Sequence, residues 1–162
     1  MDTEFNENGR TIDLISIALV SDDGREYYAV SSEFDEPACG PWLRQNVIPH
    51  LPDKSTWKPR AVIREEIESL LLEDKSPEIW AYFADYDWVV FCQLWGRMLD
   101  LPPFMPKWCR DLKQLMWMFD IGKNELPAQD GAEHDALADA RWVRDAHQHI
   151  LDVYRFDSWQ RK

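Results

Sequence analysis

The sequence lacks the features that mark membrane, exported and zinc proteins. No apolar run approaches the ~20 residues that span a bilayer, and no basic-then-apolar signal segment opens the chain. The cysteines include no C-x-x-C pair and show no zinc-ligand spacing; they are Cys39, Cys92 and Cys109. We therefore expect no membrane partner and a cytoplasmic location, where thiols stay reduced.

Basic residues are also scarce. The chain has 18 Lys and Arg residues against 30 Asp and Glu residues, which gives a formal net charge of −12. That balance argues against a protein that coats long nucleic acids through many phosphate contacts. It does not exclude a small site for a phosphodiester, because bound divalent cations can invert the local charge.

Apolar and aromatic residues are abundant. Hydrophobic residues make up 45% of the 162 positions, and nine of them are Trp. A chain of this length fits one domain and can bury roughly 70% of the surface that it exposes when unfolded. We expect a single domain that spans residues 1–162.

The first third of the chain reads as antiparallel strands. Residues 12–20 form a β-branched run, the segment Ser21-Asp22-Asp23-Gly24 supplies a turn, and residues 25–31 resume as a partner strand. Residues 2–5 also have strand character and are followed by the turn residues 6–9. Three consecutive antiparallel strands are therefore predicted.

Helices and short strands alternate in the rest of the chain. Helical spacing of apolar residues predicts helices over 62–71, from the cap Asp85 to about 98, from the cap Asp111 to Phe119, and over 136–154. Residues 77–83 look like a buried strand, and a short stretch at 107–110 follows a proline-rich loop. This order predicts an α/β fold with a mixed sheet flanked by helices.

Two acidic residues lie in the first strand. Asp2 and Glu4 are two positions apart, so both side chains emerge on the same face of the strand. Such a pair can clamp a metal ion. A D-x-E triplet is also compatible with two solvated acids at a frayed terminus.

Two further acids are predicted to face inward. Asp87 continues an apolar helical stripe, and Asp139 lies at the edge of a face lined by small alanines. A buried carboxylate needs a metal ion, a hydrogen bond or solvent to compensate it. His134 can reach the same site only from the loop before the last helix, which fits Asp135 as the helix N-cap.

Together, three motifs resemble the exonuclease motifs of the DEDDh family. They are Asp2-Thr-Glu4, Phe83-Ala-Asp-Tyr-Asp87 and His134-x-x-x-x-Asp139, in the order and separation typical of that family. Residues 86–96 and 111–115 add a resemblance to the RNase T-like branch and its small mycobacterial-type exoribonucleases. The resemblance implies an RNase H-like fold, with a five-stranded mixed sheet and the first strand central.

The resemblance also implies a mechanism. It implies 3′→5′ exonuclease activity with two Mg²⁺ or Mn²⁺ ions, held by Asp2, Glu4, Asp87 and Asp139, with His134 as general base. Hard carboxylate oxygens suit these ions, and two ions can stabilise both the attacking and the leaving oxygen. The expected products are nucleoside 5′-monophosphates from the 3′ ends of RNA or DNA single strands or short oligonucleotides. RNA is preferred by resemblance, and a homodimer is a family expectation.

Some features concern the substrate and the start of the chain. Phe5 and Trp88 adjoin the motifs and are candidates for stacking on the terminal base, although each also suits the core. Only Met1 precedes the first acid, so we expect a first strand that is short at its N-terminal end. Basic residues of a second subunit could help to hold the strand; the candidates are Arg10, Arg60, Arg64 and Lys107.

Two other function classes fit parts of the pattern. A non-catalytic nucleic-acid or nucleotide-binding module would keep the fold but not the metal ions, and a metal titration separates it from the nuclease. A phosphatase that forms a phosphoaspartate is less compatible, because Asp2-Thr-Glu4 lacks the D-x-D pattern.

Overall fold

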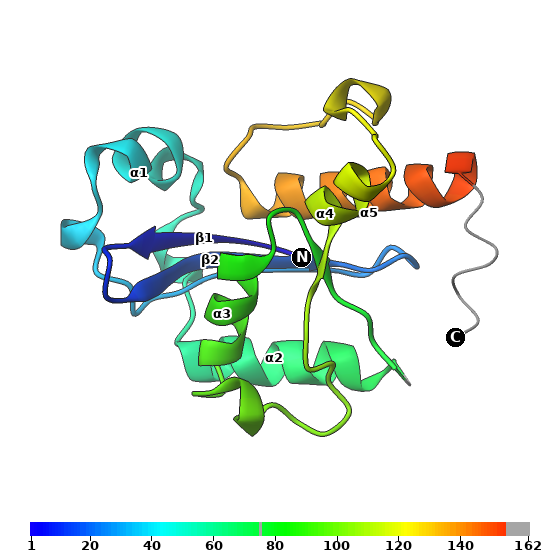
Figure 1. The fold of residues 1–162 in the computed structure, drawn as a ribbon. Coiled ribbons are helices and arrows are strands. Elements are labelled where there is room, and N and C mark those ends of the chain that lie inside the picture. The colour runs from blue at the N-terminus through cyan, green and yellow to red at the C-terminus, as the bar shows by residue number, and fades with distance from the viewer. Residues whose placement is uncertain (75, 155–162) are drawn as a thin grey trace.

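A computed structural model describes residues 1–74 and 76–154, and its architecture is mixed α/β, as the sequence predicts (Figure 1). The first three strands are β1 (Asp2–Glu7), β2 (Ile12–Val20) and β3 (Glu26–Val30). They form an antiparallel sheet in the order β1-β2-β3. The three predicted antiparallel strands are therefore confirmed. Residues 155–162 of the predicted domain lie outside the described residues.

The predicted helices are present, although the helix that begins at Asp85 ends at Gln93 and not near 98, and one helix is present that the sequence did not predict. The α-helices are α1 (Pro41–Asn46), α2 (Arg60–Leu72), α3 (Asp85–Gln93), α4 (Leu112–Met118) and α5 (Ala136–Tyr154). Short 3-10 helices occupy Glu36–Ala38, Ile48–His50, Lys54–Thr56, Met98–Asp100 and Lys123–Glu125. Over the described residues, no helix has both the length and the apolar character needed to cross a bilayer.

The predicted caps of two helices had different outcomes. Asp111 is the N-cap of α4, as predicted, because its Oδ1 accepts the amides of Lys113 at 2.7 Å and Gln114 at 3.2 Å. The prediction that Asp85 caps α3 is wrong. The helix begins at Asp85 itself and its N-cap is Ala84, which makes no side-chain cap bond. The exposed carboxylate of Asp85 instead lies in the first turn, where the helix dipole favours a negative charge.

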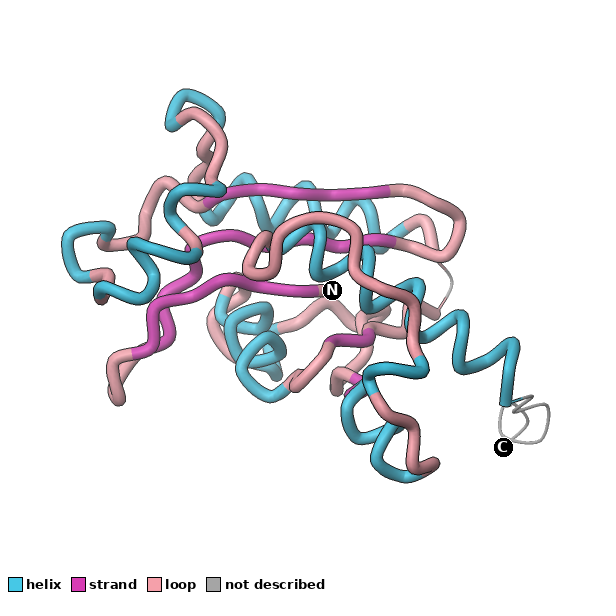
Figure 2. Tube along the Cα trace, turned by 90° about the horizontal axis from the view of Figure 1, so that it is seen from above, coloured by secondary structure: helices cyan, strands magenta, loops and turns pink. Residues whose placement is uncertain are grey.

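Helices cover both faces of the three-stranded sheet (Figures 1 and 2). Because strand side chains alternate, β2 sends neighbouring residues to opposite layers. Ile17 and Leu19 belong to a core cluster with α2 residues Ile63, Ile67 and Leu71. Ala18 packs in a separate cluster with Ala136 and Ala140 of α5. The face that holds Ala18 is therefore the face that meets the start of α5.

The continuous five-stranded sheet that the resemblance implied is not found in the described residues. The segment predicted as a strand over 77–83 contributes only β4 (Trp80–Ala81), which pairs in parallel with β5 (Arg110–Asp111) as a separate sheet. The link from β4 to the first strand is a hydrogen bond of 2.8 Å from the Met1 amino group to the Trp80 carbonyl.

The gap between the two sheets has a local cause. Two residues after the end of β4, Phe83 adopts a left-handed φ of 58°, and α3 begins at Asp85. The amide of Thr3 donates to Oδ1 of Asp87 at 2.8 Å, so a helix carboxylate takes the place that a strand carbonyl would occupy. The sheet therefore opens at the point where Asp87 reaches β1.

The hydroxyl of Thr3 offers a test of this connection. It donates to the same Oδ1 of Asp87 at 2.7 Å in a buried setting. Thr3→Val keeps the shape but removes the donor, so we expect the free energy of unfolding to fall by about 1–3 kcal/mol in urea denaturation. Thr3→Ser keeps the hydroxyl and should lose less. Equal stability of the two variants would show that this hydrogen bond does not link β1 to α3.

Candidate active site and metal centre

Strand β1 positions two acids toward the start of α5. In the β1–β2 register, Asp2 lies opposite Ala18 and Glu4 lies opposite Ser16. Directly paired residues share a face, and Ala18 packs against α5. Asp2 and Glu4 therefore face the layer that contains α5. Glu4 is only 8% exposed, so the strand carries its carboxylate into the interior.

The start of α5 holds Asp139 in a fixed orientation. Its Oδ2 accepts the backbone amide of His134 at 2.9 Å, and its Oδ1 accepts Nε2 of Gln129 at 2.7 Å. His134 has a left-handed φ of 66°, which turns the loop into the helix. Asp135 then caps α5 by accepting the amides at positions 137 and 138. His134 thus belongs to the loop before the helix, as the sequence predicts.

These elements bring three side chains into one cluster. One ligand atom from each of Glu4, His134 and Asp139 lies within 4.8 Å of the other two. The set combines two carboxylates and an imidazole, all of which are known ligands of divalent ions. The cluster joins residues that are up to 135 positions apart in the chain.

Asp87 approaches β1 from α3. Its side chain is 6% exposed, and its Oδ1 accepts both donors of Thr3, which leaves Oδ2 free of these two bonds. Asp2 lies within electrostatic reach of both sides of the site. Burial raises the pKa of Asp2 well above its usual value, and the carboxylates of Asp87, Asp139 and Glu4 raise it further.

The other three carboxylates also hold protons unusually tightly. Burial raises the pKa of Glu4 to about 8, with further contributions from Asp139 and Asp87. Burial raises the pKa of Asp87 although Thr3 hydrogen bonds oppose the shift, and burial raises the pKa of Asp139 against the bonds from Gln129 and His134. In each case desolvation disfavours the charged form.

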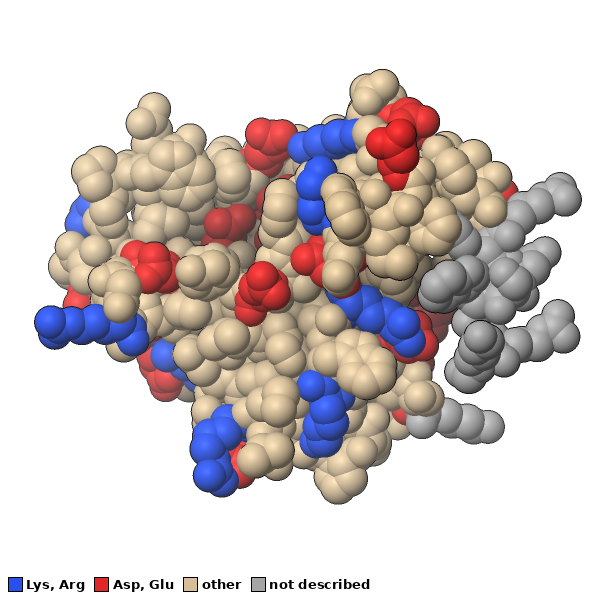
Figure 3. Space-filling view, viewed as in Figure 1, with Lys and Arg blue, Asp and Glu red and all other residues tan. Residues whose placement is uncertain are grey.

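The donor set fits a divalent cation. Within 1–74 and 76–154, no Lys or Arg forms an ion pair with Asp2, Glu4, Asp87 or Asp139. Converging carboxylates without a basic partner are stabilised in the charged form by Mg²⁺ or Mn²⁺, which prefer hard oxygen ligands. Figure 3 shows acidic surface recessed in a hollow beside α1, and the basic residues on that face are scattered rather than joined in one patch.

The two predicted stacking residues lie partly in the core. Phe5 is half-buried and its ring stacks on Tyr86 at a centroid distance of 5.5 Å. Trp88 is also half-buried and stacks on Phe91 at 5.2 Å. Tyr86 is 49% exposed, so the Phe5–Tyr86 pair has a surface that a base could reach.

Three residues that contact the site were not predicted. Thr3 and Gln129 hold the carboxylates of Asp87 and Asp139, and the ring of Trp42 lies edge-on to the ring of His134 at 4.7 Å. Trp42 is 53% exposed and lies on the short helix α1. The proline at position 41 is a signal for the start of that helix. We find no sequence signal for Gln129, which lies in an irregular loop.

Comparison with known proteins assigns the class. Residues 1–151 match the family described as the 3'-5' exoribonuclease Rv2179c-like domain. The chain therefore belongs to the Rv2179c-like 3'-5' exoribonuclease family, and the prediction of an enzyme acting on phosphodiester bonds is confirmed.

Its relatives include two proteins of Mycobacterium tuberculosis. They are the 3'-5' exoribonuclease Rv2179c of strain H37Rv and the 3'-5' exoribonuclease MT2234.1 of strain CDC 1551. Each is 49% identical to this chain over 144 residues, which cover 86% of this chain and 84% of the relative.

The raised pKa of Glu4 predicts a pH dependence of stability. Its pKa is about 8 in the folded chain against a usual value of 4.5, so the folded chain binds more protons than the unfolded chain between these values. Ionised Glu4 therefore destabilises the metal-free fold increasingly as the pH rises from about 5 to about 8.

Glu4→Gln removes this charge. The melting temperature of Glu4→Gln minus that of the unmodified chain, both measured in chelator, should increase across this pH range. Saturating Mn²⁺ should stabilise only the unmodified chain strongly. A difference that stays constant with pH would contradict the burial of an ionising Glu4.

Proposed function

We propose that this enzyme removes nucleotides from the 3′ end of RNA with the help of two divalent ions and releases nucleoside 5′-monophosphates. The observation that supports it most directly is the convergence of four carboxylates around the first strand, from β1, α3 and α5. RNA is the substrate named for both mycobacterial relatives. The motif pattern resembles the DEDDh family, and the RNase T-like branch is part of this proposal.

The proposed ligands divide between the two sides of β1. Glu4 and Asp139 would hold one ion, Asp87 would contribute Oδ2 to the other, and Asp2 would serve both. Two such ions supply positive charge to the attacking and leaving oxygens of an in-line displacement. The hydrogen bonds from Thr3 and Gln129 would fix the carboxylates before substrate arrives.

His134 is the proposed general base. Its backbone is fixed by the bond to Asp139, and its ring lies at the edge of the acidic cluster against Trp42. An imidazole can accept a proton from water, which is the role of a general base. His134 is only partly buried, so part of this residue stays accessible to solvent.

The terminal base needs an apolar surface, and the Phe5–Tyr86 pair is the proposed platform. Stacking on an aromatic ring contributes ~1–3 kcal/mol per base and tolerates any sequence. Phe5 directly follows the Asp2–Glu4 motif, and the exposed ring of Tyr86 stacks on it. Trp88 stays a predicted contact, although its ring packs on Phe91.

An RNase H-like arrangement and a homodimer complete the proposal. Strand β1 is an edge strand of the three-stranded sheet and pairs with β2; the hydrogen bond from Met1 to Trp80 on its other side supports the central position that an RNase H-like fold would give it. Of the basic residues considered for binding a strand across a dimer, Arg60 is paired with Asp13 and Lys107 donates to the Leu101 carbonyl. Arg10 is exposed in the β1–β2 turn and is the better candidate.

Short RNA and DNA labelled at the 3′ or the 5′ end test the proposed reaction. With Mg²⁺ or Mn²⁺, 3′-labelled RNA should release labelled mononucleotide at once, while 5′-labelled RNA should shorten stepwise. Chelator should abolish both. Hydrolysis that continues unchanged in chelator would rule out the two-ion proposal, and binding without hydrolysis would favour a non-catalytic module.

Matched variants test the assigned residues. Asp87→Asn should lose activity, whereas Asp85→Asn, two residues away and exposed, should retain it. His134→Ala should lower kcat about 10²–10⁴-fold at pH 7, as expected for loss of a general base. His50→Ala, which changes an exposed histidine, is the control. Full activity of His134→Ala would contradict the assignment of His134 as general base. It would not contradict the proposed metal ligands.

A further inference from the structure

Phe83 presents an exposed aromatic residue beside the candidate site. It is 59% exposed, although it directly follows the buried strand residue Ala81 and the half-buried Tyr82. It precedes Ala84, the N-cap of α3, and the buried Asp87 follows four residues later. A large apolar side chain that is exposed so close to the carboxylates needs its own explanation.

The backbone of Phe83 is held in an unfavourable conformation. Its φ of 58° lies in the left-handed region, which is sterically costly for a bulky residue. Residues in this region persist where the surrounding chain fixes them, and they cluster at functional sites. Here Oδ2 of Asp111 accepts the amide of Ala84 at 3.3 Å, while Oδ1 caps α4. The turn that carries Phe83 is therefore tied to the start of α4.

This connection brings a lysine of α4 to the exposed ring. The ammonium of Lys113 lies 6.0 Å from the centroid of the Phe83 ring, which is within the range of a cation–π contact. Over residues 1–74 and 76–154, no Asp or Glu forms an ion pair with Lys113. An anionic ligand can therefore approach the ammonium without displacing an acidic side chain.

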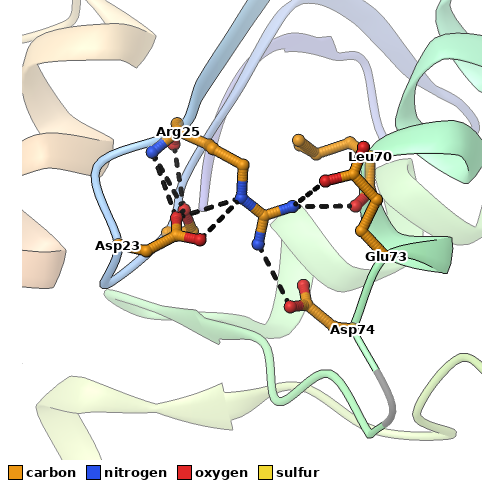
Figure 4. A network of polar contacts seen from close by, with 6 residues as sticks. Asp23, Arg25, Leu70, Glu73 and Asp74 are labelled. Atoms are coloured by element: carbon orange, nitrogen blue, oxygen red, sulfur yellow. Dashed lines mark hydrogen bonds and ion pairs between the residues drawn. The ribbon is translucent and has the colours of Figure 1, made fainter.

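Arg25 shows the opposite situation. Figure 4 shows its guanidinium between the β2–β3 turn and the end of α2. It binds Glu73 at 3.0 Å and Asp74 at 3.1 Å, and it also pairs with Asp23 in its own turn. The charge of Arg25 is thus balanced inside the protein, and its role is to tie the turn to α2.

The same face of α4 carries a second exposed ring. Trp117 follows Lys113 by four residues, so the two side chains are neighbours on the surface of the helix. Trp117 is 79% exposed. Phe83, Lys113 and Trp117 form a row of aromatic, basic and aromatic side chains, which we call the α4 strip.

A single-stranded nucleic acid matches the chemistry of the α4 strip. Exposed aromatic rings stack on successive bases of any sequence, and basic groups between them contact the phosphates. An apolar patch alone would also suit a protein partner. A lysine without an acidic partner between two rings, in a chain of net charge −12, instead favours a ligand that alternates bases with anions.

We propose that the α4 strip binds the part of the RNA on the 5′ side of the scissile phosphate. The penultimate base would stack on Phe83, the phosphate before it would contact Lys113, and the third base would stack on Trp117. Phe83 is three residues from Tyr86 of the proposed platform for the terminal base, so one strand can contact both. This inference rests on the proposed exonuclease function and adds a preference for RNAs longer than two nucleotides.

A substrate that lacks one base tests the contact with Phe83. One short RNA has a base at the penultimate position, and a matched RNA has a base-free ribose there. On the first RNA, Phe83→Ala should raise KM about 5- to 150-fold with little change in kcat, which is the range for losing one stacked base. Phe83→Trp should restore the KM. On the second RNA, Phe83→Ala and the unmodified chain should have the same KM.

The substrate comparison separates stacking from a structural role of Phe83. A variant with a distorted α3 would raise KM or lower kcat equally on both RNAs. An equal change on both RNAs, or no change on either, would overturn the proposal.

The salt dependence tests the contact with Lys113. Lys113→Ala should lower the slope of log KM against log salt concentration by ~0.7, the value for one phosphate contact on a single strand. Lys54 also lies over an aromatic ring, that of Trp57, but it pairs with Glu36. Lys54→Ala is therefore the matched control and should leave the slope unchanged. The same slope in Lys113→Ala and in the unmodified chain would contradict the phosphate contact.

Failure of the strip and failure of the exonuclease proposal give different results. If the unmodified chain hydrolyses neither RNA, the exonuclease proposal fails, and the Kd values of the same two RNAs, from fluorescence anisotropy, provide the comparison for Phe83. If Phe83→Ala or Trp117→Ala converts a dimer to a monomer in analytical ultracentrifugation, the strip belongs to a second copy of the chain. That result would overturn the assignment of the strip to RNA.

Discussion

The burial of four neighbouring carboxylates, two of them fully and two partly, is the constraint on which this structure depends. Asp2, Glu4, Asp87 and Asp139 come from three elements, and burial raises the pKa of each of them. Such an arrangement costs folding free energy unless positive charge enters the site. The proposed use of divalent cations accounts for this arrangement and agrees with membership of an exoribonuclease family.

The fold offsets this cost with hydrogen bonds of the surrounding chain. Thr3 donates twice to Asp87, while Gln129 and the His134 amide hold the two oxygens of Asp139. The bond from the Thr3 amide also explains why the sheet opens beside β1, since the carboxylate replaces a strand carbonyl. Hydrogen bonds between β1 and the strand beside it, β4, are therefore missing next to the candidate site.

Local periodicity was enough to predict much of the geometry of the candidate site. The two-residue spacing placed Asp2 and Glu4 on one face, helical spacing turned Asp87 inward, and the cap at Asp135 left His134 in the loop. These features depend on neighbours in the chain, which a sequence pattern records. The three antiparallel strands and α2 to α5 were predicted for the same reason.

The features that the sequence did not predict depend on contacts between distant segments. The Thr3 amide donates to Asp87 and not to a carbonyl of β4. Both possible acceptors lie far from Thr3 in the sequence, so no local pattern distinguishes them. Gln129 and Trp42 reach the site from irregular or very short elements that carry no periodic signal. Asp85 was misassigned because Asp is favoured both at the N-cap and in the first turn of a helix, and only the structure shows which position begins the helix.

The most direct test is a calorimetric titration of the chain with Mn²⁺ at neutral pH. The four-carboxylate centre predicts saturable binding of about two ions per chain, and both Glu4→Gln and Asp139→Asn should weaken it severely. Absence of binding at millimolar Mn²⁺, or binding that survives unchanged in both variants, would contradict the assignment of these carboxylates to a metal centre.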